Sequence, residues 1–164
     1  MISTHAATLT LTLPDETTTT RLGQAFARVL GSGDALLLSG PIGAGKSHLA
    51  RAIILAKLAT EGRIEDVPSP TYTLVQTYET IGGEIWHTDL YRLGDAGEVL
   101  ELGLDDAFET ALCLVEWPDR LGSLAPTDAL DITLMPDGAG RRATLRAEDP
   151  KWSQIVAELK RNFA

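Results

Sequence analysis

The most constraining feature of this 164-residue chain is a glycine-rich loop that lies between an apolar run and an amphipathic segment. The loop is Gly40-Pro41-Ile42-Gly43-Ala44-Gly45-Lys46-Ser47 and matches the pattern G-x-x-x-x-G-K-[ST]. Its glycines let successive backbone N–H groups approach phosphate oxygens with no Cβ in the way. A helix that starts here would add its unpaired N–H groups and the positive end of its dipole. The loop therefore predicts a phosphate cradle.

Two side chains of the loop have specific expected roles. Lys46 would reach the β- and γ-phosphates of a nucleotide, and the Ser47 hydroxyl would ligate Mg²⁺. The alternative is a glycine-rich strand-to-helix turn with an incidental lysine, which the strand and helix expected on either side disfavour. The nucleotide-binding residues expected in this segment are Gly40, Ile42, Gly43, Ala44, Gly45, Lys46, Ser47 and His48.

The rest of the chain predicts an α/β fold. Residues 35–38 are apolar throughout, as in strands buried on both faces of a parallel sheet. Other strands are expected at 8–13, 72–80, 84–91, 111–115, 130–134 and 143–146, and helices at 15–30, 46–59, 95–108 with a break at Gly103, and 152–159. We expect a single P-loop NTPase-like domain over residues 1–164, with a mixed, largely parallel central sheet flanked by helices.

The composition limits the class of protein. Hydrophobic residues make up 44% of the chain and charged residues 23%, which is typical of a globular protein. No apolar run approaches the ~20 residues of a membrane helix. The N-terminus has no basic start and no apolar run, and the lone Cys113 suits a reducing compartment, so we expect a cytoplasmic protein. A net charge of −9 disfavours tight direct binding of nucleic acids, because such a surface repels phosphate backbones.

Two acidic residues are candidates to hold Mg²⁺ and to order an attacking water. Asp89 ends the second arm of a predicted hairpin, and Glu116 ends the apolar strand at 111–115. The carboxyl ends of neighbouring strands meet at the ligand-binding edge of an α/β sheet. Glu116 is the better candidate for direct metal contact, because an apolar strand that ends in an acid is the Walker B arrangement. An exposed strand-end carboxylate is the alternative.

Other polar residues near these acids have two interpretations each. Thr71 lies where nucleotide switches sense the γ-phosphate, or in a turn stiffened by two prolines. Trp117 stacks on a base or a partner, or packs in the core. His87 has no ligand spacing with the other two histidines and is expected to be structural. An arginine that stabilises the transferred phosphate comes from this chain or from a partner, and the candidates here are Arg92, Arg120, Arg141 and Arg142.

Four motifs, in this order and spacing, resemble the TsaE (formerly YjeE) family: GPIGAGKS, SPTYTLV, HTDLYRL and LVEWPDRL. The resemblance extends from about Asp15 to Leu121. It implies a small P-loop ATPase, with ATP and Mg²⁺ as cofactors, in the biosynthesis of threonylcarbamoyladenosine (t6A) beside the anticodon of tRNA. In that family TsaD with TsaB transfers the threonylcarbamoyl group to adenosine, and TsaE binds this pair and hydrolyses ATP to sustain turnover. Activity would be weak without the pair, and tRNA would be contacted only indirectly.

The resemblance also implies roles for individual residues. Lys46 would hold phosphates, Ser47 and Glu116 would serve Mg²⁺, Asp89 would order water, Thr71 would sense the γ-phosphate, Trp117 would lie beside the nucleotide, and Glu16 and Thr19 would approach its adenine end. The catalytic set is thus Lys46, Asp89 and Glu116. The loop departs from the family at Pro41, which replaces an acid and removes one N–H.

Two other functions remain open from the residues alone. A small P-loop kinase acting on a metabolite has a similar size and loop, but the chain lacks an arginine-rich lid segment, for which Gly138-Ala139-Gly140-Arg141-Arg142 is the only weak candidate. A nucleotide-gated binding module would hydrolyse nucleotide only incidentally. A GTPase is disfavoured because no Asn-Lys-x-Asp segment occurs in the chain.

Overall fold

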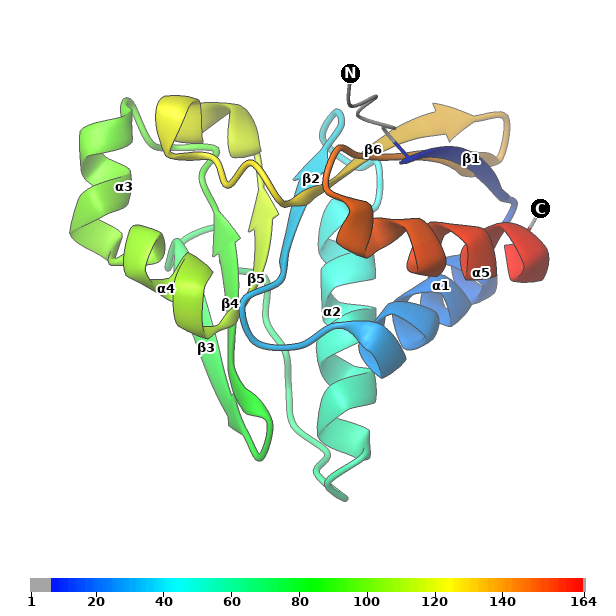
Figure 1. Cartoon of the computed structure of the whole chain (residues 1–164), viewed down its shortest axis with the longest axis horizontal. Coiled ribbons are helices and arrows are strands. Elements are labelled where there is room, and N and C mark those ends of the chain that lie inside the picture. The colour runs from blue at the N-terminus through cyan, green and yellow to red at the C-terminus, as the bar shows by residue number, and fades with distance from the viewer. Residues whose placement is uncertain (1–6, 164) are drawn as a thin grey trace.

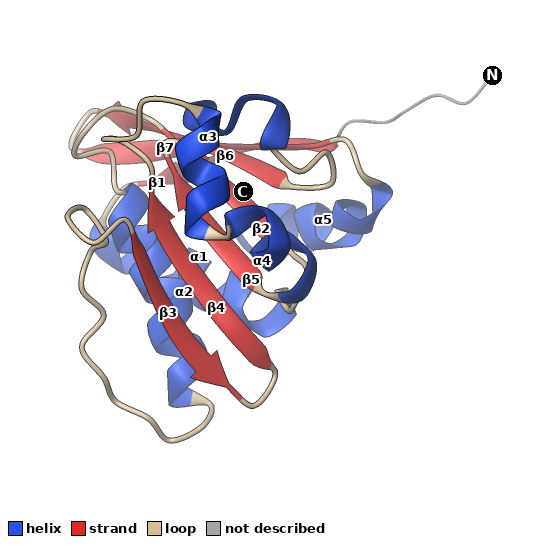
Figure 2. Cartoon of the chain, turned by 90° about the vertical axis from the view of Figure 1, so that its left-hand side faces the viewer, coloured by secondary structure: helices blue, strands red, loops and turns tan. Residues whose placement is uncertain are grey.

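The computed structural model describes residues 7–163 and contains a seven-stranded mixed sheet with helices on both faces (Figures 1 and 2). The strands are β1 (Ala7–Leu13), β2 (Ala35–Ser39), β3 (Val75–Thr80), β4 (Gly83–Asp89), β5 (Leu112–Glu116), β6 (Leu130–Asp137) and β7 (Gly140–Ala147). They are ordered β1-β7-β6-β2-β5-β4-β3 across the sheet. The middle strands β6, β2, β5 and β4 are parallel, and the outer pairs are antiparallel. The predicted α/β class with a mixed sheet is confirmed.

The helices divide between the two faces of the sheet (Figure 1). The helices α1 (Glu16–Val29), α2 (Lys46–Ala59) and α5 (Ser153–Phe163) pack on one face. The helices α3 (Ala96–Leu102) and α4 (Leu104–Thr110) and the 3-10 helix η1 (Pro118–Leu124) pack on the other; a second short 3-10 helix, η2 (Pro150–Trp152), precedes α5. Within residues 7–163, no helix is long and apolar enough to cross a membrane.

The apolar run of β2 is explained by the two cores that it separates. Leu36 and Leu38 belong to the core under α1 and α2, whereas Ala35 and Leu37 belong to the core under α3 and α4. Successive side chains point to opposite faces of a strand, so in a strand covered on both faces every side chain is buried, which favours apolar residues throughout. β5 alternates in the same way, and burial raises the pKa of its Cys113 thiol to about 12.

Two predicted strand ends and one predicted buried position are wrong, each for a local reason. β3 begins at Val75 because Leu74 has a left-handed backbone (φ 68°) and its N–H closes a turn on the Pro70 carbonyl. β4 ends at Asp89, whose carboxylate accepts the Tyr91 N–H and turns the chain. Val29, expected on the buried face of α1, is 40% exposed because it is the last residue of the helix. The predicted break between α3 and α4 is confirmed at Gly103, where φ is 81°.

Candidate functional site

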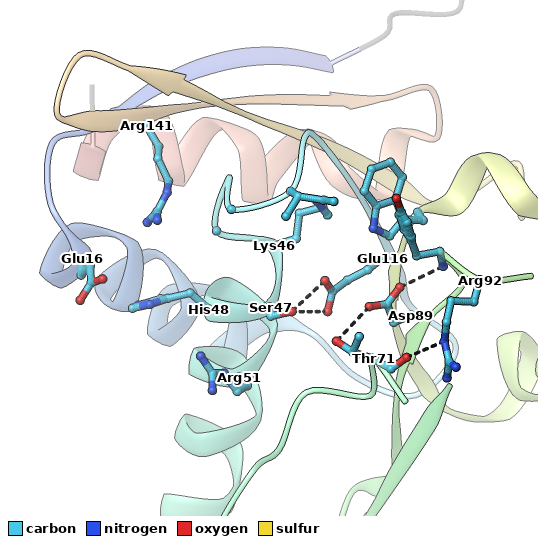
Figure 3. Close-up of a pocket in the computed structure, with 15 residues that line it drawn as sticks. Glu16, Lys46, Ser47, His48, Arg51, Thr71, Asp89, Arg92, Glu116 and Arg141 are labelled. Carbon is cyan, nitrogen blue, oxygen red and sulfur yellow. Dashed lines mark hydrogen bonds between the residues drawn. The ribbon is translucent and has the colours of Figure 1, made fainter. Parts of the chain in front are cut away.

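A cavity of about 620 Å³ opens where the parallel strands β2, β4 and β5 end (Figure 3). Open α/β sheets place their ligands at this edge. The glycine loop and the first turns of α2 form the floor of the cavity, and α1, β7 and the segments after β4 and β5 supply the walls. The lining residues are Glu16, Ile42, Gly43, Gly45, Lys46, Ser47, His48, Arg51, Thr71, Asp89, Tyr91, Arg92, Glu116, Trp117 and Arg141.

Glycine is required at two positions of the loop. Gly40 has φ 141°, and a Cβ there would collide with the Leu134 carbonyl of β6. Gly45 has φ 102° at the N-cap of α2 and offers no side chain to the helix N-terminus. The first N–H groups of α2 therefore keep their capacity to bind an anion at the cavity floor.

The Lys46 ammonium is held by its own loop. Its Nζ donates to the carbonyls of Gly40 at 2.7 Å and Pro41 at 3.0 Å, and it lies 4.5 Å from the centre of the Trp117 ring. Burial lowers the pKa of Lys46, and the nearby carboxylates of Glu116 and Asp89 oppose that shift. The ammonium is thus kept inside the cavity on neutral acceptors, which phosphate oxygens can replace.

Ser47 and Glu116 are joined directly, although 69 positions separate them in the chain. The Ser47 hydroxyl contacts both carboxylate oxygens of Glu116, at 2.8 and 2.9 Å. The Glu116 carboxylate is only 3% exposed, and its Oε2 is also 2.7 Å from Nε2 of the fully buried His87. The first turn of α2 and the end of β5 therefore place a hydroxyl and a carboxylate side by side at the cavity wall.

Asp89 is the second acid, and it lies beside Glu116 because β4 and β5 are parallel and pair these two residues. Its Oδ1 accepts the Tyr91 N–H at 3.0 Å, and its Oδ2 accepts a long 3.5 Å hydrogen bond from the Thr71 hydroxyl. Ser69 Oγ is in turn 2.7 Å from Thr71 Oγ1. The prediction that the two acids meet at one edge of the sheet is therefore confirmed, and Thr71 joins them.

Trp117 lines the cavity and is half-buried, so neither of its two predicted environments describes it alone. Its backbone is left-handed (φ 58°), and its N–H donates to the Leu38 carbonyl at 3.2 Å. Its ring meets Tyr91 edge to face, with the ring centres 4.8 Å apart. The indole therefore packs over Lys46 at the mouth of the cavity.

Three expected nucleotide residues, Gly40, Ala44 and Thr19, do not line the cavity. The expected placement of Thr19 beside Glu16 at the cavity is wrong, because Thr19 is fully buried on the inner side of α1 with its hydroxyl near the Asp15 carbonyl. Ala44 is also fully buried, and Gly40 contributes through its carbonyl.

The four arginine candidates lie in different surroundings. Arg141 lies against the glycine loop: a Cβ on Gly45 would be 3.0 Å from its Nε. Arg92 binds the segment before β3 instead, donating to the carbonyls of Thr71 and Tyr72 at 3.1 and 2.6 Å. Arg120 pairs with Asp119, and the exposed Arg142 does not line the cavity.

The sequence did not single out Arg51 and Tyr91 as lining residues. Arg51 is one helical turn after Ser47 in the predicted α2, and this spacing was the available signal for it.

The chemistry of the donor set fits Mg²⁺. Within residues 7–163, no three His, Cys, Asp or Glu side chains group into a metal site of their own. Mg²⁺ usually takes one or two protein oxygens and completes its shell with phosphates and water. The adjacent oxygens of Ser47 and Glu116 are such a pair, beside a helix N-terminus that suits phosphate.

Comparison with known proteins agrees with this geometry. The family model described as "Threonylcarbamoyl adenosine biosynthesis protein TsaE" matches residues 13–144. Three proteins named tRNA threonylcarbamoyladenosine biosynthesis protein TsaE are similar to the chain. The Rickettsia bellii protein is 38% identical over 74% of this chain and 83% of its own length. The Haemophilus influenzae protein is 39% identical over 72% and 76%, and the Bacillus subtilis protein is 32% identical over 91% and 90%.

A solved structure shows the same fold. The crystal structure of Bacillus subtilis YdiB superposes with a TM-score of 0.76 over 98% of this chain and 99% of that one, at 24% identity. The match of the family model over most of the chain, together with relatives above 30% identity, shows that this chain belongs to the TsaE family.

Proposed function

We propose that this protein is a single-domain, Mg²⁺-dependent ATPase that acts with TsaD and TsaB in the cytoplasm to sustain t6A formation on tRNA. The observation that carries the proposal is the direct contact of Ser47 with Glu116 beside the glycine loop. This contact puts a hydroxyl and a carboxylate next to the N-terminus of α2, which is the arrangement that a nucleotide with its metal requires. The names of the family and its relatives support the tRNA pathway.

Different residues of the cavity bind the phosphates, the metal and the attacking water. The N–H groups of the loop and of α2 bind phosphates, and Lys46 exchanges its loop carbonyls for phosphate oxygens. Ser47 and Glu116 hold Mg²⁺, which when bound neutralises charge that develops on the transferred phosphoryl group. Asp89 orients the attacking water, and Thr71, bonded to Asp89, senses the γ-phosphate.

The other lining residues bind the remainder of the nucleotide. Glu16 and His48 lie on α1 and α2, away from the two acids (Figure 3), and they contact the nucleoside end. Trp117 covers Lys46 at the cavity mouth. The charge of −9 favours a protein partner over RNA as the direct contact, so tRNA is reached through TsaD.

The test is ATP hydrolysis by the purified protein with Mg²⁺, alone and with TsaD and TsaB from the same organism. We expect weak activity alone, a clear rise with the pair, and no activity from Lys46→Ala, which removes the ammonium on which phosphate binding depends. Activity in Lys46→Ala equal to that of the wild type would overturn the ATPase assignment. A pair that neither co-elutes with the protein nor changes its rate would overturn the partnership and direct the search to small-molecule phosphate acceptors.

A further inference from the structure

His87 is a fully buried histidine at the site whose role the proposed function leaves unassigned. It lies two residues before Asp89 on β4, on the same side of the strand, and β4 pairs in parallel with β5 so that Asp89 is opposite Glu116. The imidazole therefore reaches diagonally across two strands to the Glu116 carboxylate, with Nε2 2.7 Å from Oε2.

The direction of this hydrogen bond follows from the groups involved. An ionised carboxylate only accepts hydrogen bonds, and the Ser47 hydroxyl already donates to it. His87 must therefore carry a proton on Nε2 and donate it to Oε2. Glu116 then receives one donor from α2 and one from β4, which fixes its side chain from both sides.

A role in packing alone does not explain an imidazole at this position. Among the residues that the structure describes, Nδ1 of His87 has no hydrogen-bond partner, and burying an unpaired polar atom costs free energy. An apolar side chain in the same strand would avoid that cost. The contact that distinguishes histidine from an apolar residue here is its bond to Glu116.

We propose that His87 is a positioning residue, which holds Oε2 of Glu116 so that the carboxylate faces the Ser47 hydroxyl and the two form a ready pair of oxygen ligands for Mg²⁺. A free glutamate has three side-chain torsions to order when it binds a metal, and a fixed partner removes part of that cost. Partners that orient ligating carboxylates typically matter by 10–100-fold in metal affinity. This inference rests on the proposed function, because it requires that the site take Mg²⁺ with a nucleotide.

The test compares three variants: His87→Leu removes the donor, His87→Gln keeps an N–H near the place of Nε2, and Thr88→Val is a matched control. Thr88 is the next residue of β4, is equally buried, and has a hydroxyl with no partner among the described residues. The measurement is ADP affinity by calorimetry, once with Mg²⁺ titrated from micromolar to millimolar and once in EDTA. Thermal unfolding of each variant is recorded alongside.

We expect His87→Leu to raise the Mg²⁺ concentration needed for half of the affinity gain by about 10–100-fold, with the affinity in EDTA unchanged. His87→Gln should recover most of the loss, and Thr88→Val should match the wild type. Equal losses with Mg²⁺ and in EDTA, or no recovery in His87→Gln, would show a merely structural role and overturn the inference. If the ADP affinity of the wild-type protein did not depend on the Mg²⁺ concentration, the proposed function would be overturned, and this inference with it.

A second measurement needs no variant and covers the case in which His87→Leu fails to fold. Nitrogen NMR of the wild-type imidazole rings in metal-free buffer reports which nitrogen carries the proton. A proton on Nε2 of His87 supports the proposal. A neutral ring with its proton on Nδ1 alone would leave Nε2 unable to donate and would overturn it.

Discussion

The two ends of the cavity differ in how their side chains are held, and this difference suggests a different role for each end. At one end, Ser47, Asp89 and Glu116 come from strand ends and the first turn of α2, and they are bonded to one another or to near neighbours. At the other end, Glu16 and Arg141 come from α1 and β7, and no hydrogen bond joins them within the described chain (Figure 3). A reacting group needs a fixed geometry, so we assign the hydrogen-bonded end to the chemistry and propose that the other end binds the rest of the nucleotide.

The largest difference between the two ends is expected from removing one carboxylate at each. Glu116→Ala takes away the proposed metal ligand and frees both Ser47 and His87, so Mg²⁺-dependent ATP turnover should fall by at least about 100-fold. Glu16→Ala removes an exposed carboxylate and should change turnover by only about threefold or less. Steady-state hydrolysis with the TsaD and TsaB pair measures both.

The control for this comparison is folding. Glu116 is buried and Glu16 is exposed, so the unfolding temperature of each variant separates lost chemistry from lost structure. Equal turnover in two folded variants would contradict the assignment of the metal to the end of the cavity that holds Ser47, Asp89 and Glu116, which we call the strand-built end.

A smaller effect is expected from Arg141, whose guanidinium lies against Gly45 of the loop. Arg141→Ala should weaken nucleotide affinity about 10-fold, or ~1.4 kcal/mol, which is near the lower end of what one hydrogen bond from a charged group to the bound nucleotide contributes. Turnover at saturating ATP should change much less. Its neighbour Arg142 is exposed and outside the cavity, so Arg142→Ala is the matched control.

Calorimetric titration with ADP resolves the expected difference between these two arginine variants. A loss of turnover at saturation in Arg141→Ala would instead place this arginine at the reacting phosphate. The nucleoside end would then share in the chemistry, and the contrast between the two ends would fail.

The strand-built end was largely predictable because its determinants are local. An apolar run, a glycine loop and a helix follow one another in the chain, and the strand-end rule brings Asp89 beside Glu116 without knowledge of side chains. The bond from His87 to Glu116 was missed, because it depends on the register of β4 against β5 and joins residues 29 positions apart in the chain. The sequence predicted a structural role for His87 and named no partner for it.

The other end was less predictable because helix rotation and hairpin register position its residues. Thr19 was placed at the cavity, with Glu16, only on the resemblance to the TsaE family. Its spacing from Leu22 and Phe26, at i+3 and i+7, puts it on the buried stripe of α1, and that signal was the stronger one. Arg141 reaches the loop through the β6–β7 hairpin, whose turn sets its register, but no local pattern shows that this end of the hairpin packs against the glycine loop.

The smallest effect is expected from Trp117→Phe. This variant also tests whether Trp117 contacts only Lys46 or stacks on the base of the nucleotide. The indole lies over the Lys46 ammonium, and a phenyl ring attracts a cation less strongly; the whole contact contributes about 0.5–1 kcal/mol at a partly exposed site. Nucleotide affinity should therefore change by only about threefold. We expect bound phosphates to draw Lys46 away from the ring, so the wild-type tryptophan fluorescence should change on adding ADP, and Trp117→Phe should lose this change. Trp86→Phe, made at a half-buried indole on β4 outside the cavity, should keep it.

A loss of affinity above about 10-fold in Trp117→Phe would exceed what this cation contact supplies, and it would mean that the indole stacks on the base. The nucleoside would then lie at the strand-built end, and the division of the cavity argued above would be reversed.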